Sequence, residues 1–91
     1  MEKIRLLVID DNIQLASAIK EYFKNNKSIE VVKTAKDGSE GMDIILNQQD
    51  EFDLIILDLI MPVKDGIYVL SEMKSKNIEK DIIVTTSYNA T

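Results

Sequence analysis

The segment FDLIILDLIMPVKDG, from Phe52 to Gly66, decides the fold. Its apolar run LIIL (residues 54–57) is too short for a typical helix and ends abruptly at Asp58. Such a run is typical of a strand buried on both faces, as in a parallel sheet covered by helices. Open α/β sheets bind ligands at the carboxyl ends of their strands. The segment therefore places the carboxylate of Asp58 where functional sites form.

The pattern repeats along the chain. A second apolar run, IRLLVI, precedes Asp10-Asp11-Asn12, and we expect strands at residues 4–9, 29–34, 53–57 and 82–84. The strand at 29–34 is partly alternating, which favours a place nearer the sheet edge. Between the strands, apolar residues at helical spacing predict three helices. Lys36-Asp37-Gly38 is a predicted turn, with Ser39 as the expected N-cap of the second helix. The residues expected to face the core are Leu15, Ile19, Tyr22 and Phe23, then Met42, Ile45 and Leu46, then Ile67, Leu70 and Met73.

The strand–helix alternation predicts a parallel sheet with right-handed crossovers. Three of the four strands end in acids or hydroxyls: Asp10-Asp11, Asp58 and Thr85-Thr86. The carboxyl ends of parallel strands share one edge, so these groups should converge there. Taken one at a time, these acids and hydroxyls also have purely structural explanations. Asp10-Asp11-Asn12 could cap a helix, Asp58 could bond to loop amides, and the threonines could be ordinary strand residues.

Composition limits the possible functions. The 91 residues suit one small domain, and 45% are apolar. The net charge of −5, from 11 basic and 16 acidic residues, argues against a nucleic-acid surface in this segment. No stretch could span a bilayer, so the expected compartment is the cytoplasm. Without His or Cys, zinc is disfavoured, and oxygen ligands select Mg²⁺, Ca²⁺ or Mn²⁺. Mg²⁺ fits a solvent-facing acidic cluster, beside which a carboxylate can act as a nucleophile on phosphorus.

Three motifs together resemble the receiver domain of bacterial two-component response regulators. They are VIDDN (residues 8–12), LDLIMPVKDG (residues 57–66) and the Thr that follows the fourth strand. The resemblance implies that Asp58 is the phosphoacceptor and that Asp10 and Asp11 hold Mg²⁺ together with Asp58. It also implies that the backbone carbonyl of Ile60 is a further ligand. Thr86, followed by Ser87-Tyr88, matches the hydroxyl residue that moves toward the phosphoryl group.

The resemblance implies a flavodoxin-like, doubly wound parallel sheet with strand order 2-1-3-4-5. Residues 1–91 match about four strands and three helices, so we expect an incomplete receiver domain lacking the fourth helix, fifth strand and fifth helix. The family's Lys after strand five has no counterpart here. The strand-four edge (residues 82–84) would then be open, which predicts self-association. Within the family, the opening MEKIRLLVIDDN and LDLIMPVKDG look most like the receivers of sporulation transcription factors of spore-forming bacteria.

The expected function is therefore phosphoacceptance. The module would take a phosphoryl group on Asp58 from a sensor histidine kinase or a histidine phosphotransfer protein, with Mg²⁺ assistance. It would assist its own phosphorylation without small-molecule turnover and would normally control a transcription-regulating output domain. The main alternative is an interaction or dimerisation module that has lost phosphotransfer. A metal-dependent phosphatase would want a second acid where Ile60 stands, and a flavin carrier would need a phosphate loop after the first strand.

Overall fold

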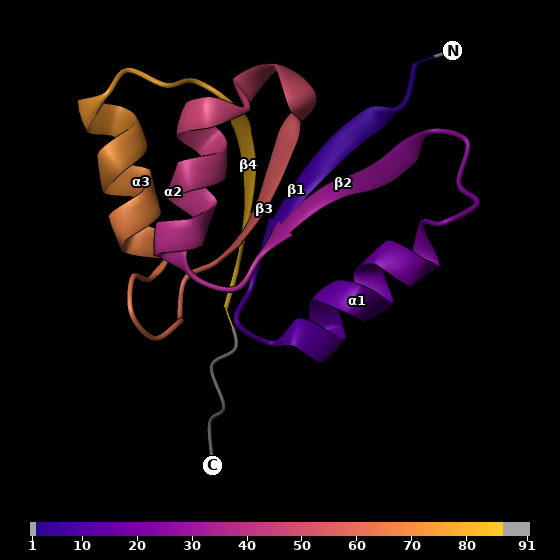
Figure 1. Cartoon of the computed structure of the whole chain (residues 1–91), viewed down its shortest axis with the longest axis horizontal. Coiled ribbons are helices and arrows are strands. Elements are labelled where there is room, and N and C mark those ends of the chain that lie inside the picture. Colours follow the sequence, from indigo (N-terminus) through magenta and orange to yellow (C-terminus); the bar gives the residue numbers. More distant parts are fainter. Residues whose placement is uncertain (1, 87–91) are drawn as a thin grey trace.

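The computed structural model describes residues 2–86, which form a parallel sheet and three α-helices (Figure 1). In chain order the elements are β1 (Ile4–Ile9), α1 (Ile13–Tyr22), β2 (Ile29–Ala35), α2 (Gly38–Asn47), the 3₁₀ turn η1 (Gln49–Glu51), β3 (Leu54–Asp58), α3 (Gly66–Ser75) and β4 (Asp81–Thr85). The predicted strands agree with these bounds to within one residue at each end.

The strand order is β2-β1-β3-β4, and all neighbouring strands are parallel. This order equals the first four strands of the flavodoxin-like 2-1-3-4-5 arrangement, so the predicted fold class is confirmed. β2 lies at one edge, as its alternating sequence indicated. β1 and β3 lie in the centre, which places the strand ends at Ile9 and Asp58 side by side.

Helices cover both faces of the sheet, α2 and α3 on one face and α1 on the other (Figure 1). Leu7, Ile9, Ile55 and Leu57 pack beneath α2 and α3 in the larger core cluster. The intervening residues of β1 face α1, where Ala16 completes the smaller cluster. β1 therefore buries both of its faces, and on β3 the Leu54 and Ile56 side chains on the α1 side are half-buried, which explains why both sequences are apolar runs rather than alternating ones.

Several predicted helix details are wrong. The side chains of Leu15, Tyr22, Leu46 and Ile67 are 43–81% exposed rather than buried. Each helix fully buries only a few of its positions, and these four are not among them. α3 buries Gly66, Val69 and Met73, of which only Met73 was predicted, while the predicted Leu70 is half-buried against the same core. The N-cap of α2 is Asp37, not Ser39, because the Asp37 side chain accepts the Glu40 N–H at 2.8 Å.

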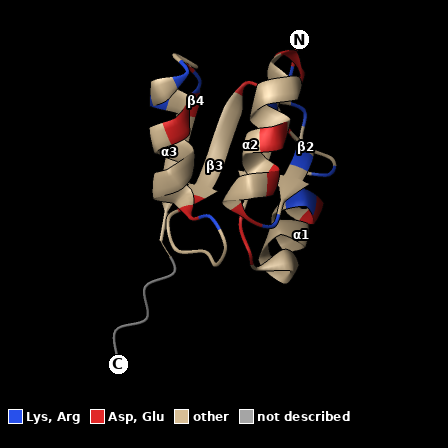
Figure 2. Cartoon of the chain, turned by 60° about the vertical axis from the view of Figure 1, so that its left-hand side comes forward, with Lys and Arg blue, Asp and Glu red and all other residues tan. Residues whose placement is uncertain are grey.

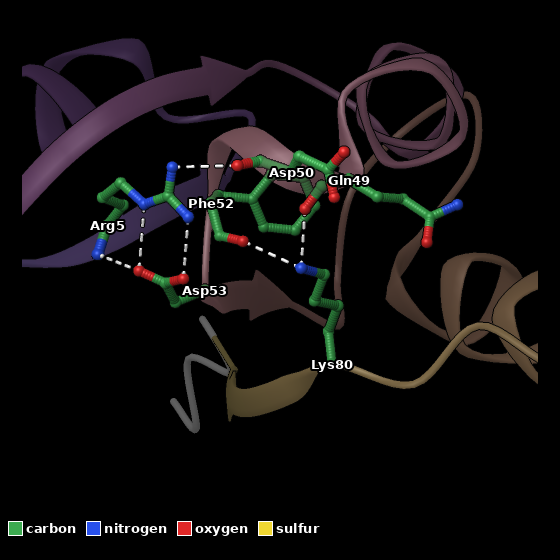
Figure 3. Close-up of polar contacts among 6 residues, drawn as sticks. All are labelled: Arg5, Gln49, Asp50, Phe52, Asp53 and Lys80. Atoms are coloured by element: carbon green, nitrogen blue, oxygen red, sulfur yellow. Dashed lines mark hydrogen bonds and ion pairs between the residues drawn. The ribbon is translucent and has the colours of Figure 1, made fainter.

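A polar network joins the strands at their amino-terminal ends, opposite the ends at which Asp10 and Asp58 lie (Figure 3). Arg5 donates from Nε and Nη2 to the two carboxylate oxygens of Asp53, at 3.1 and 3.0 Å. Its Nη1 donates to the Asp50 carbonyl at 2.9 Å. The Lys80 ammonium donates to the carbonyls of Gln49 (2.6 Å) and Phe52 (2.9 Å). Both cations bind backbone oxygens of the η1–β3 connection, which they join to β1 and β4.

Acidic and basic residues are interspersed over the helices and loops of the described chain (Figure 2). Within residues 2–86, no helix is both long enough and apolar enough to cross a membrane.

Candidate functional site at the carboxyl edge of the sheet

Three carboxylates meet where β1 and β3 end. Ile9 pairs with Leu57, so the residues that follow them, Asp10 and Asp58, leave the sheet next to each other. Asp10, Asp11 and Asp58 each offer a carboxylate oxygen, and these oxygens all lie within 4.8 Å of one another. The parallel topology therefore brings together side chains that are almost 50 residues apart in the sequence.

The backbone around the cluster fixes two of the carboxylates. Asp58 is 2% exposed, and its Oδ1 accepts the Ile60 N–H at 3.0 Å. Asp10 is also buried, and its Oδ1 accepts the Asn12 N–H at 2.8 Å. Asp11 is exposed to solvent. Each buried acid thus has one oxygen bound by the loop that follows its own strand.

Helix capping explains only one of the three residues after β1. The side chain of Asn12 accepts the Leu15 N–H at 2.9 Å and is the N-cap of α1. No such bond to a helical amide is made by Asp10, whose carboxylate bonds only to the loop amide of Asn12 within the described residues. The capping interpretation therefore fits Asn12, and the acid pair needs another one.

The electrostatics of the cluster favour a cation. Burial raises the pKa of Asp10, the hydrogen bond from Asn12 opposes this rise, and the neighbouring carboxylates of Asp58 and Asp11 add to it. A positive ion among the three would relieve this repulsion. Opposite ligands of an octahedral Mg²⁺ are about 4.2 Å apart, so oxygens that lie within 4.8 Å of one another would have to move by at most about 0.6 Å to share one ion. With oxygen donors alone, the site suits a hard cation such as Mg²⁺.

The loop after Asp58 (residues 59–65, the β3–α3 loop) is closed at its base. Leu59 donates its N–H to the Thr85 carbonyl at 3.0 Å and accepts the Gly66 N–H at 3.3 Å. A Cβ on Gly66 would lie 2.6 Å from the Asp58 carbonyl oxygen, so only glycine allows α3 to start this close to β3. Asp65 is the N-cap of α3, where it accepts the Tyr68 N–H at 3.0 Å.

Ile60 lies within this loop, and its side chain is 51% exposed. Its N–H is bound to the Asp58 carboxylate, so the backbone that would supply the fourth oxygen ligand is tied to the acidic cluster. Its role as a ligand stays a prediction.

The two threonines at the end of β4 differ in their surroundings. Thr85 pairs with Asp58 across the sheet, and its hydroxyl donates to the Leu57 carbonyl at 3.4 Å. Thr86 follows the strand and, like Thr85, is exposed. The assignment of Thr86 as the mobile hydroxyl residue stays a prediction, and the neighbouring Ser87-Tyr88 that favoured it lies outside the described residues.

Two features of the β3–α3 loop were not predicted. Val63 has a φ of 68°, a left-handed conformation that is a genuine outlier for a β-branched residue. The carbonyl of Lys64 accepts the Gly38 N–H at 2.6 Å, which joins this loop to the start of α2. Asp37-Gly38 was predicted only as part of a turn, and no local signal indicated a contact with a segment more than 20 residues away.

Comparison with known proteins identifies the family of the chain. The family model "Response regulator receiver domain" matches residues 6–91. The receiver domain of the Francisella response regulator 1452 superposes with a TM-score of 0.82 at 31% identity, over 98% of this chain and 70% of that one. The response regulator domain of Thermotoga maritima CheB gives 0.81 at 29% identity, over 94% and 62%. The chain belongs to the response regulator receiver domain family.

Curated relatives match over most of this chain. The probable C4-dicarboxylate response regulator DctR of Bacillus subtilis is 37% identical over 83 residues, 91% of this chain and 36% of its own length. A protein-glutamate methylesterase/protein-glutamine glutaminase of Clostridium acetobutylicum is 37% identical over 87 residues, 96% of this chain and 25% of its own length. The chain thus spans about a third or less of these relatives. Neither name refers to sporulation, so that narrower resemblance stays a proposal.

Proposed function

We propose that this chain is a phosphoacceptor module that takes a phosphoryl group on Asp58 from a phosphohistidine of a sensor histidine kinase or a phosphotransfer protein. The observation that carries the proposal is the buried Asp58 carboxylate, held with Asp10 and Asp11 within 4.8 Å in a receiver-domain fold. A carboxylate on a rigid strand end, with one oxygen bound by Ile60 and the other unbound in the described residues, is suited to nucleophilic attack.

In the proposed step, the unbound oxygen of Asp58 forms a bond to phosphorus while the bond from phosphorus to the imidazole nitrogen breaks. The released nitrogen keeps the electron pair and takes a proton, and Asp58 becomes an acyl phosphate. Asp10, Asp11 and Asp58, with the Ile60 carbonyl, would hold Mg²⁺. The ion would neutralise charge on the phosphoryl oxygens. Thr86 would donate a hydrogen bond to one of these oxygens.

The chain would assist this transfer without turnover of a small molecule, and it would act in the cytoplasm. Through the state of Asp58 it would control a transcription-regulating output domain. The sequences MEKIRLLVIDDN and LDLIMPVKDG favour an output domain of the sporulation transcription factor type over other output domains.

Intact mass measurement after incubation with Mg²⁺ and acetyl phosphate tests the proposal. We expect one added phosphoryl group on the wild type and none on Asp58→Asn or in the presence of a chelator. Asp43→Asn is the matched control, because it removes the same charge at an exposed position of α2 and should be modified like the wild type. A folded wild-type chain that gains no phosphoryl group, or an Asp58→Asn variant that still gains one, would contradict phosphoacceptance at Asp58.

A second candidate function is self-association without phosphotransfer, and the β4 edge favours it. β4 is an edge strand of the described sheet, and Ile83 and Val84 are 52% and 46% exposed. An exposed apolar edge strand is a template for pairing with another chain. Sedimentation velocity should show dimers that Ile83→Lys dissociates. A wild type that is monomeric at all concentrations would exclude this candidate.

A further inference from the structure

The start of α2 and the β3–α3 loop touch through backbone atoms. Gly38 donates its N–H to the Lys64 carbonyl at 2.6 Å. A Cβ on Gly38 would overlap the Lys64 carbonyl oxygen and would lie 2.9 Å from its carbon and 3.0 Å from the Asp65 oxygen. These are backbone atoms, which cannot rotate away as a side chain can. A side chain at residue 38 would therefore push the loop outward.

Space, not backbone conformation, explains the glycine at this position. No glycine among the described residues has a positive φ, so an L-residue could adopt the backbone angles of Gly38. Gly41, one turn further along α2, contrasts with it. A Cβ there would meet the side-chain end of Ile9 at 2.6 Å, which is a contact within the core. Gly38 is thus the glycine of α2 whose missing side chain is matched to the loop.

The loop can transmit such a displacement to the acidic cluster. Its base is fixed at Leu59, which bonds to Thr85 and to Gly66, and Ile60 is bound to the Asp58 carboxylate. Between these points Val63 is held at a φ of 68°, so contacts at the loop's ends and at Lys64 impose its shape against a local preference. Ordinary contacts begin at 3.4 Å, so a Cβ on Gly38 would require the Lys64 carbonyl carbon to recede by at least about 0.5 Å, and the nearer carbonyl oxygen by more.

We propose that Gly38 is a positioning residue for the metal site. By lacking a side chain, it lets α2 hold the Lys64 carbonyl, which keeps the loop in the shape that presents the Ile60 carbonyl beside Asp10, Asp11 and Asp58. This inference rests on the proposed function, since it concerns the same Mg²⁺ site.

Calorimetric titration with Mg²⁺ tests the inference, with Gly38→Ala compared with Ile45→Val. Ile45 is fully buried on the same helix, and its truncation lowers stability by removing a core methyl group without adding an atom next to Lys64. We expect Gly38→Ala to raise the Mg²⁺ dissociation constant about tenfold, the size of effect typical of residues that orient metal ligands. Ile45→Val should stay within about twofold of the wild type. In metal-free protein, the Ile60 amide resonance should move in Gly38→Ala and stay in place in Ile45→Val.

The outcomes separate the two proposals. A wild type that binds no Mg²⁺ would remove the proposed metal site itself. A wild type that binds, with Gly38→Ala binding equally well, would overturn the positioning role alone. If Gly38→Ala does not fold, Mg²⁺ titration of the wild type by NMR decides. The Gly38 amide should shift through the Lys64 carbonyl while the Ile45 amide stays in place, and an unmoved Gly38 amide would overturn the inference.

Discussion

Replacing Asp58 with Asn should stabilise the metal-free protein and weaken its response to Mg²⁺. Asp58 is 2% exposed, and its carboxylate lies within 4.8 Å of those of Asp10 and Asp11. Two unit charges at that distance repel by about 3.5 kcal/mol at an effective dielectric constant of 20. Solvent around Asp11 screens part of this energy, and the bond from Ile60 weakens when its acceptor becomes neutral. A net gain of about 1–2 kcal/mol remains, which corresponds to a Tm rise of at least about 4 °C in a domain of this size.

Urea unfolding in chelator and in excess Mg²⁺ measures both effects. The wild type should gain about 1.4 kcal/mol at a Mg²⁺ concentration ten times its dissociation constant. Asp58→Asn should gain less, because one of the ligands is no longer charged. Asp43→Asn controls for the change in net charge, since Asp43 is exposed on α2. A midpoint for Asp58→Asn in chelator at or below that of the wild type, or an equal rise in Asp43→Asn, would refute the repulsion argument.

Three further predictions concern the strained loop and the opposite edge of the sheet. Val63→Gly should increase the free energy of unfolding in urea by about 0.5–1 kcal/mol, because the cost of holding Val in a left-handed conformation exceeds the backbone entropy cost of Gly. A lower free energy of unfolding would show that Val63 is unstrained. The hydrogen bonds from Arg5 lower the pKa of Asp53 to about 2. The stabilisation from this pair is present above the usual Asp pKa of 3.8 and is lost as the pH falls toward 2. Asp53→Asn should therefore make the free energy of unfolding depend less on pH between 3.8 and 2, and a pH dependence equal to that of the wild type would contradict this. Lys80→Met removes two bonds to backbone carbonyls and should cost about 1–3 kcal/mol without changing Mg²⁺ affinity; a weaker Mg²⁺ site would link the two edges of the sheet.

Much of the fold follows from the local sequence because the two central strands carry apolar residues on both faces. The runs at Ile4–Ile9 and Leu54–Asp58 can be recognised without their partner strands, because they contain no polar residue apart from Arg5 and the terminal Asp58. The helices were predicted as elements, but their buried faces were only partly predicted. Leu15 in α1 and Ile67 in α3 each belong to an apolar stripe that is wider than the set of residues the helix buries. Which part of the stripe is buried depends on how the helix docks, and the sequence of one helix does not contain that information.

The sequence by itself determined that acids follow two central strands and that a structured loop follows Asp58. It could do so because strand ends and turn residues are local features. The tertiary structure alone decided that the Asp10 and Asp58 carboxylates become buried beside each other. It also decided that Asn12 rather than an acid caps α1, and that Gly38 donates its N–H to the Lys64 carbonyl. These contacts join segments about 25 to 50 residues apart, or depend on which of several adjacent polar residues a helix end selects. Their energies arise only once the chain is packed.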